Sequence, residues 1–265
     1  MKKYLVIGNP IQHSLSPKLH NYWIKNNNID AIYDKKKVDQ NGLKDLIKQI
    51  GDDKINGANV TVPYKKEIIP FLDELTATAT ETQSVNIIYK KNKKIIGDNT
   101  DVGGFMKSLH HINYDIKNKN AFILGAGGVA PSIIIALKRM GASKIILSNR
   151  SKEKAENIKK KYPFLELIDW GNSKAFDIII NATSLGLNEN DEIKLDYETI
   201  EKNKLFYDVI YNPRQTKFLK KGKELGNQTE NGTIMFAYQA QLSFKIWHNI
   251  KPAVNDKVIQ LLEND

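Results

Sequence analysis

An apolar segment that runs directly into a glycine-rich turn constrains the fold of this chain more than any other feature. Residues 121–124 read Ala-Phe-Ile-Leu, and residues 125–130 read Gly-Ala-Gly-Gly-Val-Ala. Glycines in such a turn let the backbone come close to a pyrophosphate, and a helix that follows aims free N–H groups at it. The sequence therefore predicts a strand, a phosphate-binding turn and a helix. A tight turn without a ligand is the alternative for a lone glycine motif.

The residues after the turn favour nucleotide binding and indicate which nucleotide. Apolar residues recur at helical spacing over 129–140, and a second apolar strand is predicted at 144–148. After that strand comes Asn-Arg-Ser at 149–151, where proteins that bind NAD usually carry an acidic residue for the ribose hydroxyl. The planar fork of Arg150 suits a 2′-phosphate instead, and Lys154 adds a positive charge one turn further on. We therefore predict NADP(H) as the cofactor, with a solvated surface arginine as the alternative.

The composition excludes several kinds of protein. The chain has 265 residues, enough for a full core in one or two domains. It contains no cysteine, so disulfides, thiolate nucleophiles and zinc–thiolate sites are excluded, and its five histidines lack the spacing of a metal-binding motif. No apolar run reaches the about 18 residues of a membrane span. Gly-Asn-Pro at 8–10 ends the first apolar run too early for an export segment, so we expect a cytoplasmic protein.

The net charge of +10 raises the question of nucleic-acid binding. The lysines are dispersed in short runs at 35–37, 90–94 and 159–161, and no aromatic residues alternate with them as in a single-strand binding groove. We interpret these runs as solvated faces and a hairpin turn. A positive field attracts small anions, so an anionic substrate and cofactor are the expected partners, without nucleic acid or membrane.

Strands and helices alternate before and after the glycine-rich turn, which indicates an α/β fold with two domains. Ahead of the turn we predict strands near 4–8, 31–38, 57–62 and 84–89, helices near 17–27, 41–50 and 64–79, and a hairpin over 89–95. After it, near-continuous apolar runs at 177–181 and 205–210 suit strands buried on both faces of a parallel sheet. We place a mostly parallel α/β sheet domain at 1–102, completed by the helices of 235–265, and a Rossmann-type domain at 103–234, with hinges at Gly103-Gly104 and Asn231-Gly232.

The segment 57–65, Gly-Ala-Asn-Val-Thr-Val-Pro-Tyr-Lys, is the best indication of a substrate site. Asn59 and Thr61 alternate with apolar residues, so both side chains share one face near the carboxyl end of a strand, where α/β proteins bind ligands. Pro63 is predicted to start a helix with Lys65 in or near its first turn. Because the helix dipole disfavours a positive charge at that end, the placement suggests a function for Lys65, with a surface lysine as the alternative.

Other polar residues each have a structural explanation that competes with a functional one. Asp101 or the threonine before it could cap a helix, and Ser16 before a proline makes a good cap, whereas capping does not explain Ser14. Asn86 begins a predicted strand, where a turn role is the default. Gln239 lies on an apolar helical stripe and needs a hydrogen-bond partner in the core or in a ligand.

Taken together, these segments resemble the shikimate dehydrogenase family over essentially the whole chain. The matching segments are GNPIQHSLSP at 8–17, GANVTVPYK at 57–65, SVN at 84–86, GDNTD at 97–101, GAGGVA at 125–130, NRS at 149–151, NATSLG at 181–186, YNPRQT at 211–216 and QA at 239–240. The chain departs from the usual pattern at Gln83-Ser84, Ile87, Val102 and Thr233-Ile234. None of these departures removes a group that carries chemistry.

The resemblance implies an enzyme that reversibly reduces 3-dehydroshikimate to shikimate with NADPH, in the biosynthesis of chorismate and the aromatic amino acids. It implies an active site in the cleft between two α/β domains, which close on the substrate as a hinge. The expected partners are small molecules, and the chain is expected to be a monomer or a homodimer.

The resemblance also assigns roles to particular residues. Lys65 would be the catalytic general acid and base beside Asp101, and Tyr211 would close over the substrate. Ser14 and Ser16 would hold the substrate carboxylate. The residues that would bind substrate hydroxyls are Asn59, Thr61, Asn86, Asp101 and Gln239. The expected cofactor-binding residues are Gly125, Ala126, Gly127, Gly128, Val129, Ala130, Asn149, Arg150, Ser151, Lys154, Asn181, Thr183 and Ser184.

The residue types suit that chemistry. Hydride delivered to a ketone leaves negative charge developing on oxygen, which needs a positive group and a proton, and a lysine supplies both. A neighbouring carboxylate favours the charged amine. We therefore expect Asp101 mainly to orient Lys65 and to bind a substrate hydroxyl. No metal is required, because the lysine does the electrophilic work.

Three other functions compete with this one. An NAD-dependent quinate/shikimate dehydrogenase fits less well, because Arg150 replaces the acidic residue and the Ser14/Ser16 pair suits shikimate better than quinate. A non-catalytic, shikimate-sensing homologue would not need Lys65 and Asp101 and would carry an added DNA-binding segment. A basic nucleic-acid module would need a clustered basic face, and its binding would depend steeply on salt.

Overall fold

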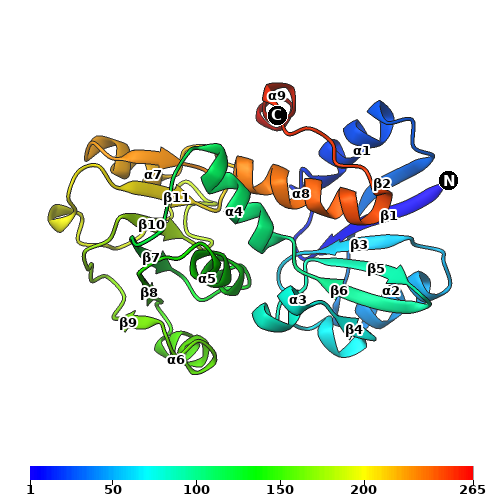
Figure 1. The fold of residues 1–265 in the computed structure, drawn as a ribbon, viewed down its shortest axis with the longest axis horizontal. Coiled ribbons are helices and arrows are strands. Elements are labelled where there is room, and N and C mark those ends of the chain that lie inside the picture. The colour runs from blue at the N-terminus through cyan, green and yellow to red at the C-terminus, as the bar shows by residue number, and fades with distance from the viewer. Residues whose placement is uncertain (265) are drawn as a thin grey trace. The chain divides into compact units, whose positions relative to one another are not determined.

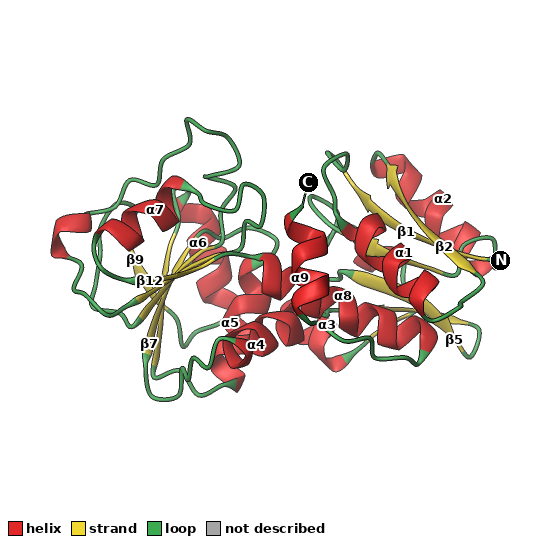
Figure 2. Cartoon of the chain, turned by 90° about the horizontal axis from the view of Figure 1, so that it is seen from above, coloured by secondary structure: helices red, strands yellow, loops and turns green. Residues whose placement is uncertain are grey.

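The computed structural model describes residues 1–264, in which the chain forms two compact units. The first consists of Met1–Phe105 and the segment that begins at Ala237, and the second of Met106–Phe236. Each unit contains a six-stranded sheet with helices packed on it (Figure 1, Figure 2). The α/β class expected from the alternation of strands and helices is confirmed.

The first unit has a mixed but mostly parallel sheet. Its elements are β1 (Lys2–Gly8), α1 (Ser16–Asn26), β2 (Ala31–Lys37), α2 (Gln40–Gly51), β3 (Gly57–Val60), the 3-10 helix η1 (Ile69–Phe71), β4 (Glu74–Leu75), α3 (Ala77–Thr82), β5 (Ile87–Lys91), β6 (Lys94–Asp98), the first part of α4 (Asp101–His111), most of α8 (Thr233–His248), and α9 (Asp256–Glu263). The strand order is β2-β1-β3-β5-β6-β4. β1 is parallel to β2 and β3, and β4 to β6, whereas β5 is antiparallel to β3 and β6.

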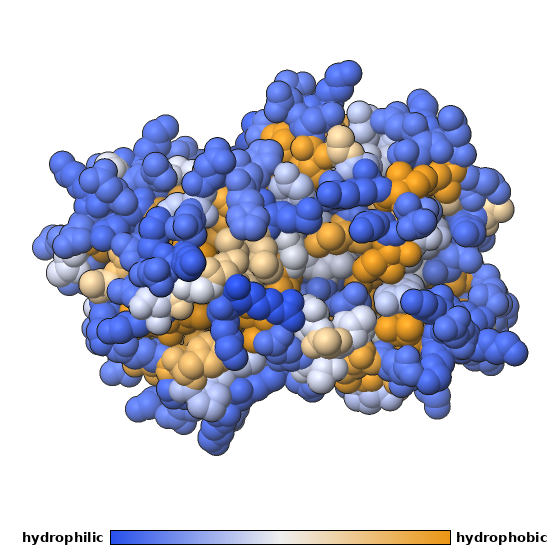
Figure 3. All heavy atoms as spheres, viewed as in Figure 1, coloured by the Kyte–Doolittle hydropathy of each residue, from blue (hydrophilic) through white to orange (hydrophobic). Residues whose placement is uncertain are grey.

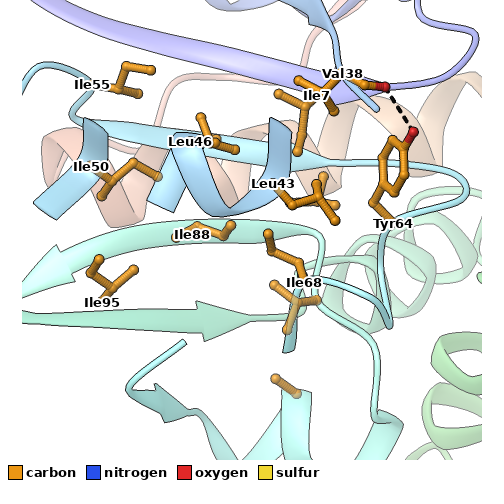
Figure 4. Close-up of a cluster of buried hydrophobic side chains, with 14 residues drawn as sticks. Ile7, Val38, Leu43, Leu46, Ile50, Ile55, Tyr64, Ile68, Ile88 and Ile95 are labelled. Carbon is orange, nitrogen blue, oxygen red and sulfur yellow. Dashed lines mark hydrogen bonds between the residues drawn. The ribbon is translucent and has the colours of Figure 1, made fainter. Parts of the chain in front are cut away.

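Helix α2 shows how the core of this unit forms. The Asp39 side chain caps the helix by accepting the Gly42 N–H at 2.8 Å, and apolar residues recur along one helical face. That face buries Leu43, Leu46 and Ile50 against the sheet (Figure 4). Burial of each such side chain contributes roughly 1.5–3 kcal/mol to folding, so the amphipathic pattern is enough to dock the helix.

The helix predicted at 64–79 does not form. The structure has turns over 62–68, then η1, β4 and the short helix α3 in its place. Pro70 explains the interruption, because proline has no N–H to donate within a helix and disfavours a helical conformation at the residue before it. The Thr76 hydroxyl then accepts the Ala79 N–H at 3.2 Å and starts α3 as a separate helix.

The second unit has a fully parallel sheet. Its elements are the end of α4, β7 (Asn120–Leu124), α5 (Ala130–Arg139), β8 (Lys144–Ser148), α6 (Lys152–Lys161), β9 (Glu166–Ile168), β10 (Ile178–Asn181), the 3-10 helix η2 (Tyr197–Thr199), β11 (Leu205–Asp208), α7 (Lys217–Glu224), β12 (Gln228–Glu230) and the start of α8. The order is β12-β11-β10-β7-β8-β9, with every neighbouring pair parallel. The chain therefore changes direction across the sheet between β7 and β10. In doubly wound folds ligands bind at this switch point, outside the carboxyl ends of the strands.

The predicted strand, turn and helix around residue 125 are present as β7 and α5. Pro131 lies in the first turn of α5, and Gly141 after its end has a φ of 81°, a left-handed conformation that glycine adopts without strain. The glycines predicted as a hinge, Gly103 and Gly104, lie inside α4. A side chain at Gly103 would come within 2.6 Å of Leu242 Cδ1 on α8, so this glycine lets the two helices pack closely.

Hydrophilic residues cover most of the face shown in Figure 3, with smaller apolar patches between them. Every helix within residues 1–264 is too short or too polar to cross a membrane.

Candidate active site

Lys65 and Asp101 form a buried ion pair in the first unit. The Lys65 Nζ donates to Asp101 Oδ2 at 2.5 Å, and the two side chains are only 11% and 7% exposed. Burying two charges costs desolvation energy that their attraction often fails to recover, so such a pair is weak evidence of a stabilising role. An amine beside a fixed carboxylate can transfer a proton, and this makes the pair a candidate acid–base centre.

The location of Lys65 has a different cause from the one expected. Lys65 lies in the turns of 62–68 and not in the first turn of an α-helix, so the argument from the helix dipole does not apply. Its carbonyl oxygen accepts the Val85 N–H at 2.8 Å, which ties this turn to the segment leading into β5. The side chain is then held by the Asp101 carboxylate.

Asn86 holds the second oxygen of that carboxylate. Its Nδ2 donates to Asp101 Oδ1 at 2.8 Å, and its Oδ1 accepts the Thr100 N–H at 2.7 Å. The same Nδ2 lies 3.4 Å from Gln239 Oε1 on α8. The structure thus brings four predicted site residues together from separate segments of the first unit.

The start of α4 is capped by Asn99, for which no capping role was expected. The Asn99 Oδ1 accepts the N–H groups of Asp101 and Val102, at 3.0 and 3.3 Å. The expectation that Asp101 or Thr100 could cap this helix is therefore wrong. Because Asn99 satisfies the free N–H groups, the Asp101 carboxylate is available to Lys65 and Asn86.

The two serines at the start of α1 have the reverse of their expected structural roles. The N-cap residue is Leu15, which makes no capping bond with its side chain, and α1 begins at Ser16. The Ser14 hydroxyl accepts the Ser16 N–H at 3.3 Å. The Ser16 side chain is 5% exposed and does not cap the helix, because Ser16 is already its first residue. Local capping thus explains Ser14 better than Ser16.

Asn59 and Thr61 differ in exposure and in how many hydrogen-bonding groups of the side chain remain for a ligand. Asn59 is 6% exposed, and its Nδ2 donates to the Asn86 carbonyl oxygen and to Ser243 Oγ, both at 3.0 Å. Its Oδ1 accepts the Tyr33 hydroxyl at 2.7 Å. Thr61 follows β3, is partly exposed, and its hydroxyl makes no hydrogen bond with the part of the chain that the structure describes.

Three buried residues of this site were missed from sequence: Tyr33, Thr100 and Ser243. The Thr100 hydroxyl lies 2.9 Å from Asn86 Nδ2 and 3.2 Å from Ser243 Oγ. A signal for Ser243 existed, because it lies one helical turn after Gln239 and therefore on the same face. A sequence signal for Tyr33 existed too, because it is the one aromatic residue in a lysine-rich strand. It is also the one buried residue of β2.

In the second unit the loops after β7 and β10 meet at the switch point. Gly125 has a φ of 111°, and a side chain there would come within 2.7 Å of Thr183 Cγ2 and 2.9 Å of the Ala182 carbonyl carbon. The glycine is therefore required both by its conformation and by the closeness of the neighbouring loop. Helix α5, which follows, has no side-chain cap at Val129. The Ala130 N–H donates to the Gly127 carbonyl oxygen at 3.2 Å, and Pro131 has no N–H.

Asn149 connects the glycine-rich turn to the loop that carries the predicted phosphate ligand. Its Oδ1 accepts the Ala126 N–H at 3.0 Å, and its Nδ2 donates to the Ser151 carbonyl oxygen at 2.8 Å. Ser151 caps α6 by accepting the Lys154 N–H at 3.4 Å. Arg150 and Lys154 are exposed, and within residues 1–264 neither side chain has a hydrogen bond or ion pair.

Asn181 holds the loop after β10 in place through the hydrogen bonds of its side chain. It is fully buried, and its Oδ1 accepts both the N–H and the hydroxyl of Thr183, at 3.0 and 2.7 Å. Its Nδ2 donates to Asp208 Oδ1 at 3.0 Å. Asp208 also accepts the Thr216 hydroxyl at 2.7 Å, so it ties this loop to the one that carries Tyr211. Burial raises the pKa of Asp208 to about 6.

Tyr211 lies in the loop between β11 and α7 of the second unit. Its ring is tilted by 36° against that of Phe236, with centroids 4.6 Å apart. The side chain is partly exposed, which leaves one part of the phenol ring accessible.

Comparison with known proteins decides the family. The sequence profile described as the shikimate dehydrogenase substrate binding domain matches residues 6–88, and the one described as shikimate / quinate 5-dehydrogenase matches residues 107–218. The shikimate dehydrogenase (NADP(+)) of Pelagibacter ubique is 58% identical over 262 residues, which cover 99% of each chain. The chain belongs to the shikimate dehydrogenase family.

Solved structures of this family agree over the full length. The shikimate dehydrogenase of Aquifex aeolicus superposes with a TM-score of 0.90 and 37% identity, covering 100% of this chain and 98% of the other. That of Thermus thermophilus, solved in complex with NADP(H) and shikimate, has a TM-score of 0.91 and 25% identity over 99% of both chains. The family resemblance and the two-domain α/β fold expected from the sequence are confirmed.

The second unit of this shikimate dehydrogenase family member has the features that a dinucleotide requires. Thr183 and Ala182 leave no space for a side chain at Gly125, so the glycine lets the loops after β7 and β10 lie close together at the switch point. The first turn of α5 has no side-chain cap, and the helix dipole favours a negative charge at this end. Arg150 and Lys154, both exposed near the start of α6, place two positive charges beside this loop.

Proposed function

We propose that this chain catalyses the reversible, NADPH-dependent reduction of 3-dehydroshikimate to shikimate. The observation that carries the proposal is the buried Lys65–Asp101 pair, whose carboxylate is also held by Asn86. Reduction of a ketone develops negative charge on its oxygen, and a lysine held in one orientation can both stabilise that charge and protonate it. In this proposal the first unit binds the substrate, and the second binds the cofactor and supplies Tyr211.

Lys65 is the general acid of the reduction and the general base of the oxidation. NADPH, when bound, supplies the hydride. Lys65 Nζ gives a proton to the substrate oxygen as its charge develops, and takes the proton back in the reverse direction. Because Asp101 Oδ2 accepts one Nζ hydrogen, it turns the remaining hydrogens of the ammonium group away from itself and towards the substrate.

The carboxylate of Asp101 has capacity for the substrate as well as for its protein partners. It accepts one bond from Lys65 and one from Asn86, and a carboxylate offers about four acceptor sites. A substrate hydroxyl can therefore donate to it without displacing either partner. In this proposal Ser14 and Ser16 hold the substrate carboxylate and Tyr211 closes over the ring. The other residues that contact hydroxyls are Thr61, Asn86 and Gln239, with Asn59 behind them.

The loops at the switch point hold the cofactor. The backbone of 125–130 binds the pyrophosphate, and Arg150 and Lys154 bind the 2′-phosphate. Thr183 and Ser184 border the cofactor from the loop after β10. Asn149 and Asn181 shape these loops, because their amide groups are used within the protein.

The proposal is tested by following the absorbance of reduced nicotinamide while the purified protein oxidises shikimate. NADP and NAD are run in parallel, with quinate as a second substrate and Lys65→Ala as the control. We expect rapid reduction of NADP with shikimate and its loss in Lys65→Ala. Faster oxidation of shikimate with NAD than with NADP would contradict the role proposed for Arg150. A folded protein that binds shikimate but turns over with neither cofactor would favour the sensing homologue.

A further inference from the structure

Asp208 is a buried carboxylate at the carboxyl end of β11, next to the loops of the switch point. Its exposed fraction is 0%, and within residues 1–264 no cation pairs with it. Burial raises its pKa to about 6, so the group is charged at neutral pH. A buried charge is costly unless hydrogen bonds compensate it. The groups that donate these bonds therefore indicate what the charge holds in place.

Two of the donors lie at opposite ends of the loop that carries Tyr211. Asp208 Oδ1 accepts the N–H of Ile210, the residue before Tyr211, at 3.0 Å, and Oδ2 accepts the Thr216 hydroxyl at 2.7 Å. Thr216 is also the N-cap residue of α7. One carboxylate thus bonds both ends of the loop over 209–216, and these bonds restrict where Tyr211 can lie.

The third donor belongs to the loop after β10. Asn181 and Asp208 are register partners at the ends of the neighbouring strands β10 and β11 (Figure 1), and Asn181 Nδ2 donates to Asp208 Oδ1 at 3.0 Å. The same nitrogen donates to the Leu185 carbonyl oxygen at 2.9 Å, and a carbonyl oxygen can only accept. The orientation of the amide is therefore fixed, and its oxygen accepts the N–H and the hydroxyl of Thr183.

The two loops also pack directly on each other at Gly186 and Thr216. Gly186 has a φ of 119°, and a side chain there would come within 2.9 Å of Thr216 Cγ2. Because closely packed groups transmit a displacement to one another, a shift of one loop moves the other. The Asp208 carboxylate lies where the hydrogen bonds of both loops converge.

We propose that Asp208 is a positioning residue for both ligands. It acts on shikimate through Tyr211 and on NADP through Asn181 and Thr183, without contacting either ligand. An ionised carboxylate suits this position because both of its oxygens accept, whereas an amide of the same shape offers one acceptor and one donor. This inference rests on the function proposed above.

The test is Asp208→Asn, which keeps the shape of the side chain. The amide oxygen can still accept from Ile210 and Asn181, but the NH2 group cannot accept the Thr216 proton. In steady-state kinetics we expect the KM for shikimate and the KM for NADP each to rise about tenfold, the effect of about one lost hydrogen bond. The kcat should change less than about threefold, because the proposed acid–base pair lies in the other unit.

A second substitution separates the two routes. In the background of Tyr211→Phe, which removes the phenol hydroxyl, Asp208→Asn should raise the KM for shikimate less than about threefold. It should still raise the KM for NADP about tenfold there, because that effect passes through Asn181 and Thr183. A loss of stability alone would not distinguish the two ligands in this way.

The matched control is Tyr207→Phe. Tyr207 precedes Asp208 on β11, so its side chain lies on the opposite face of the sheet, where its hydroxyl oxygen is 2.9 Å from Ser108 Oγ. We expect this variant to lower the melting temperature but to leave both KM values unchanged. If Asp208→Asn fails to fold, Thr216→Val removes the same bond from its other side and keeps a methyl group against Gly186, and both KM values should rise there too.

The outcomes separate this inference from the proposed function. If the wild-type chain oxidises no shikimate, the proposed function fails and the inference fails with it. If the wild-type chain is active and Asp208→Asn, or Thr216→Val in its place, keeps both KM values within about twofold of wild type, the inference alone is wrong. An equal rise of the KM values in Tyr207→Phe, or an undiminished rise of the KM for shikimate in the Tyr211→Phe background, would also overturn it.

Discussion

At the scale of single residues, burial decides what a pair of charges does in this protein. Lys90 and Asp53 form an ion pair at 2.7 Å, but the Asp53 side chain is 69% exposed, and water weakens the attraction to about 0–1 kcal/mol. Lys65 and Asp101 lie 2.5 Å apart with both side chains nearly buried. Removing one partner there leaves a charge without water or a counter-charge, which costs about 3–5 kcal/mol. The two pairs have the same chemistry but different consequences.

Asp101→Asn should therefore impair both function and stability. We expect kcat/KM for shikimate to fall at least about tenfold, because Lys65 loses the group that orients it, and the free energy of unfolding to fall by about 3–5 kcal/mol. Steady-state kinetics and urea unfolding measure the two effects. Asp53→Asn is the control and should change the free energy of unfolding by no more than about 1 kcal/mol. Unchanged turnover and shikimate affinity in Asp101→Asn would show that the carboxylate neither orients Lys65 nor binds the substrate.

At the scale of elements, the close approach of two loops defines the cofactor edge of the second sheet. The loops follow β7 and β10, the two strands at which the chain changes direction. Gly125 has a left-handed φ of 111° and lies against Thr183 and Ala182. Gly171, in another loop of the same unit, has a φ of 96° but no atom within 4 Å of the position of a side chain. The two glycines share a backbone conformation and differ in their surroundings.

Alanine at each of these glycines separates the two effects. We expect Gly171→Ala to cost about 1 kcal/mol or somewhat more from the backbone conformation alone, with the KM for NADP unchanged. Gly125→Ala should cost more and should raise the KM for NADP at least about tenfold, because the added methyl group pushes the two loops apart. Thermal unfolding measures the loss of stability, and cofactor titration measures the affinity for NADP. Similar cofactor affinities in the two variants would mean that the closeness of the loops has no role in binding.

At the scale of the whole molecule, burial shifts the pKa values of titratable groups in the two units with opposite consequences for stability in acid. In the first, burial lowers the pKa of His20 to about 3 and that of His248 to about 4, from 6.5. The unfolded chain then binds these protons before the folded one, so stability falls as the pH drops through 6.5. In the second, burial raises the pKa of Asp208 from 3.8 to about 6 and that of Glu230 from 4.5 to about 7. There the folded chain binds the protons first, and stability rises as the pH falls from neutral towards 4.

Hydrogen exchange resolved along the chain tests this difference. Between pH of about 7 and about 5, protection of amides in β1 and α2 should fall relative to that of amides in β7 and β10, after correction for the intrinsic exchange rates. His20→Phe keeps an aromatic ring against Tyr33 and removes one titrating group, so it should reduce the loss in the first unit. Parallel changes in both units would show that these buried groups do not control the response.

Much of the fold was predictable because the signals are local. The glycine-rich turn, the helix after it and the Arg150 loop are each specified by a few neighbouring residues, and the motifs that indicate the family are equally short. The helix expected at 64–79 does not form, for one local reason and one long-range reason. Pro70 could have been weighed more heavily, but β4 forms only because it pairs with β6, some twenty residues later in the chain.

The sequence by itself determined the α/β class, the family and the residue types of the site, because apolar periodicity and short motifs carry that information. Only the tertiary structure decided which polar groups meet. Asn59 bonds Ser243, 184 residues away, and Asp101 is free for Lys65 because Asn99 takes over the helix cap. These bonds depend on burial and on the register of distant segments, since a polar group that loses water must bond to whatever the fold places beside it.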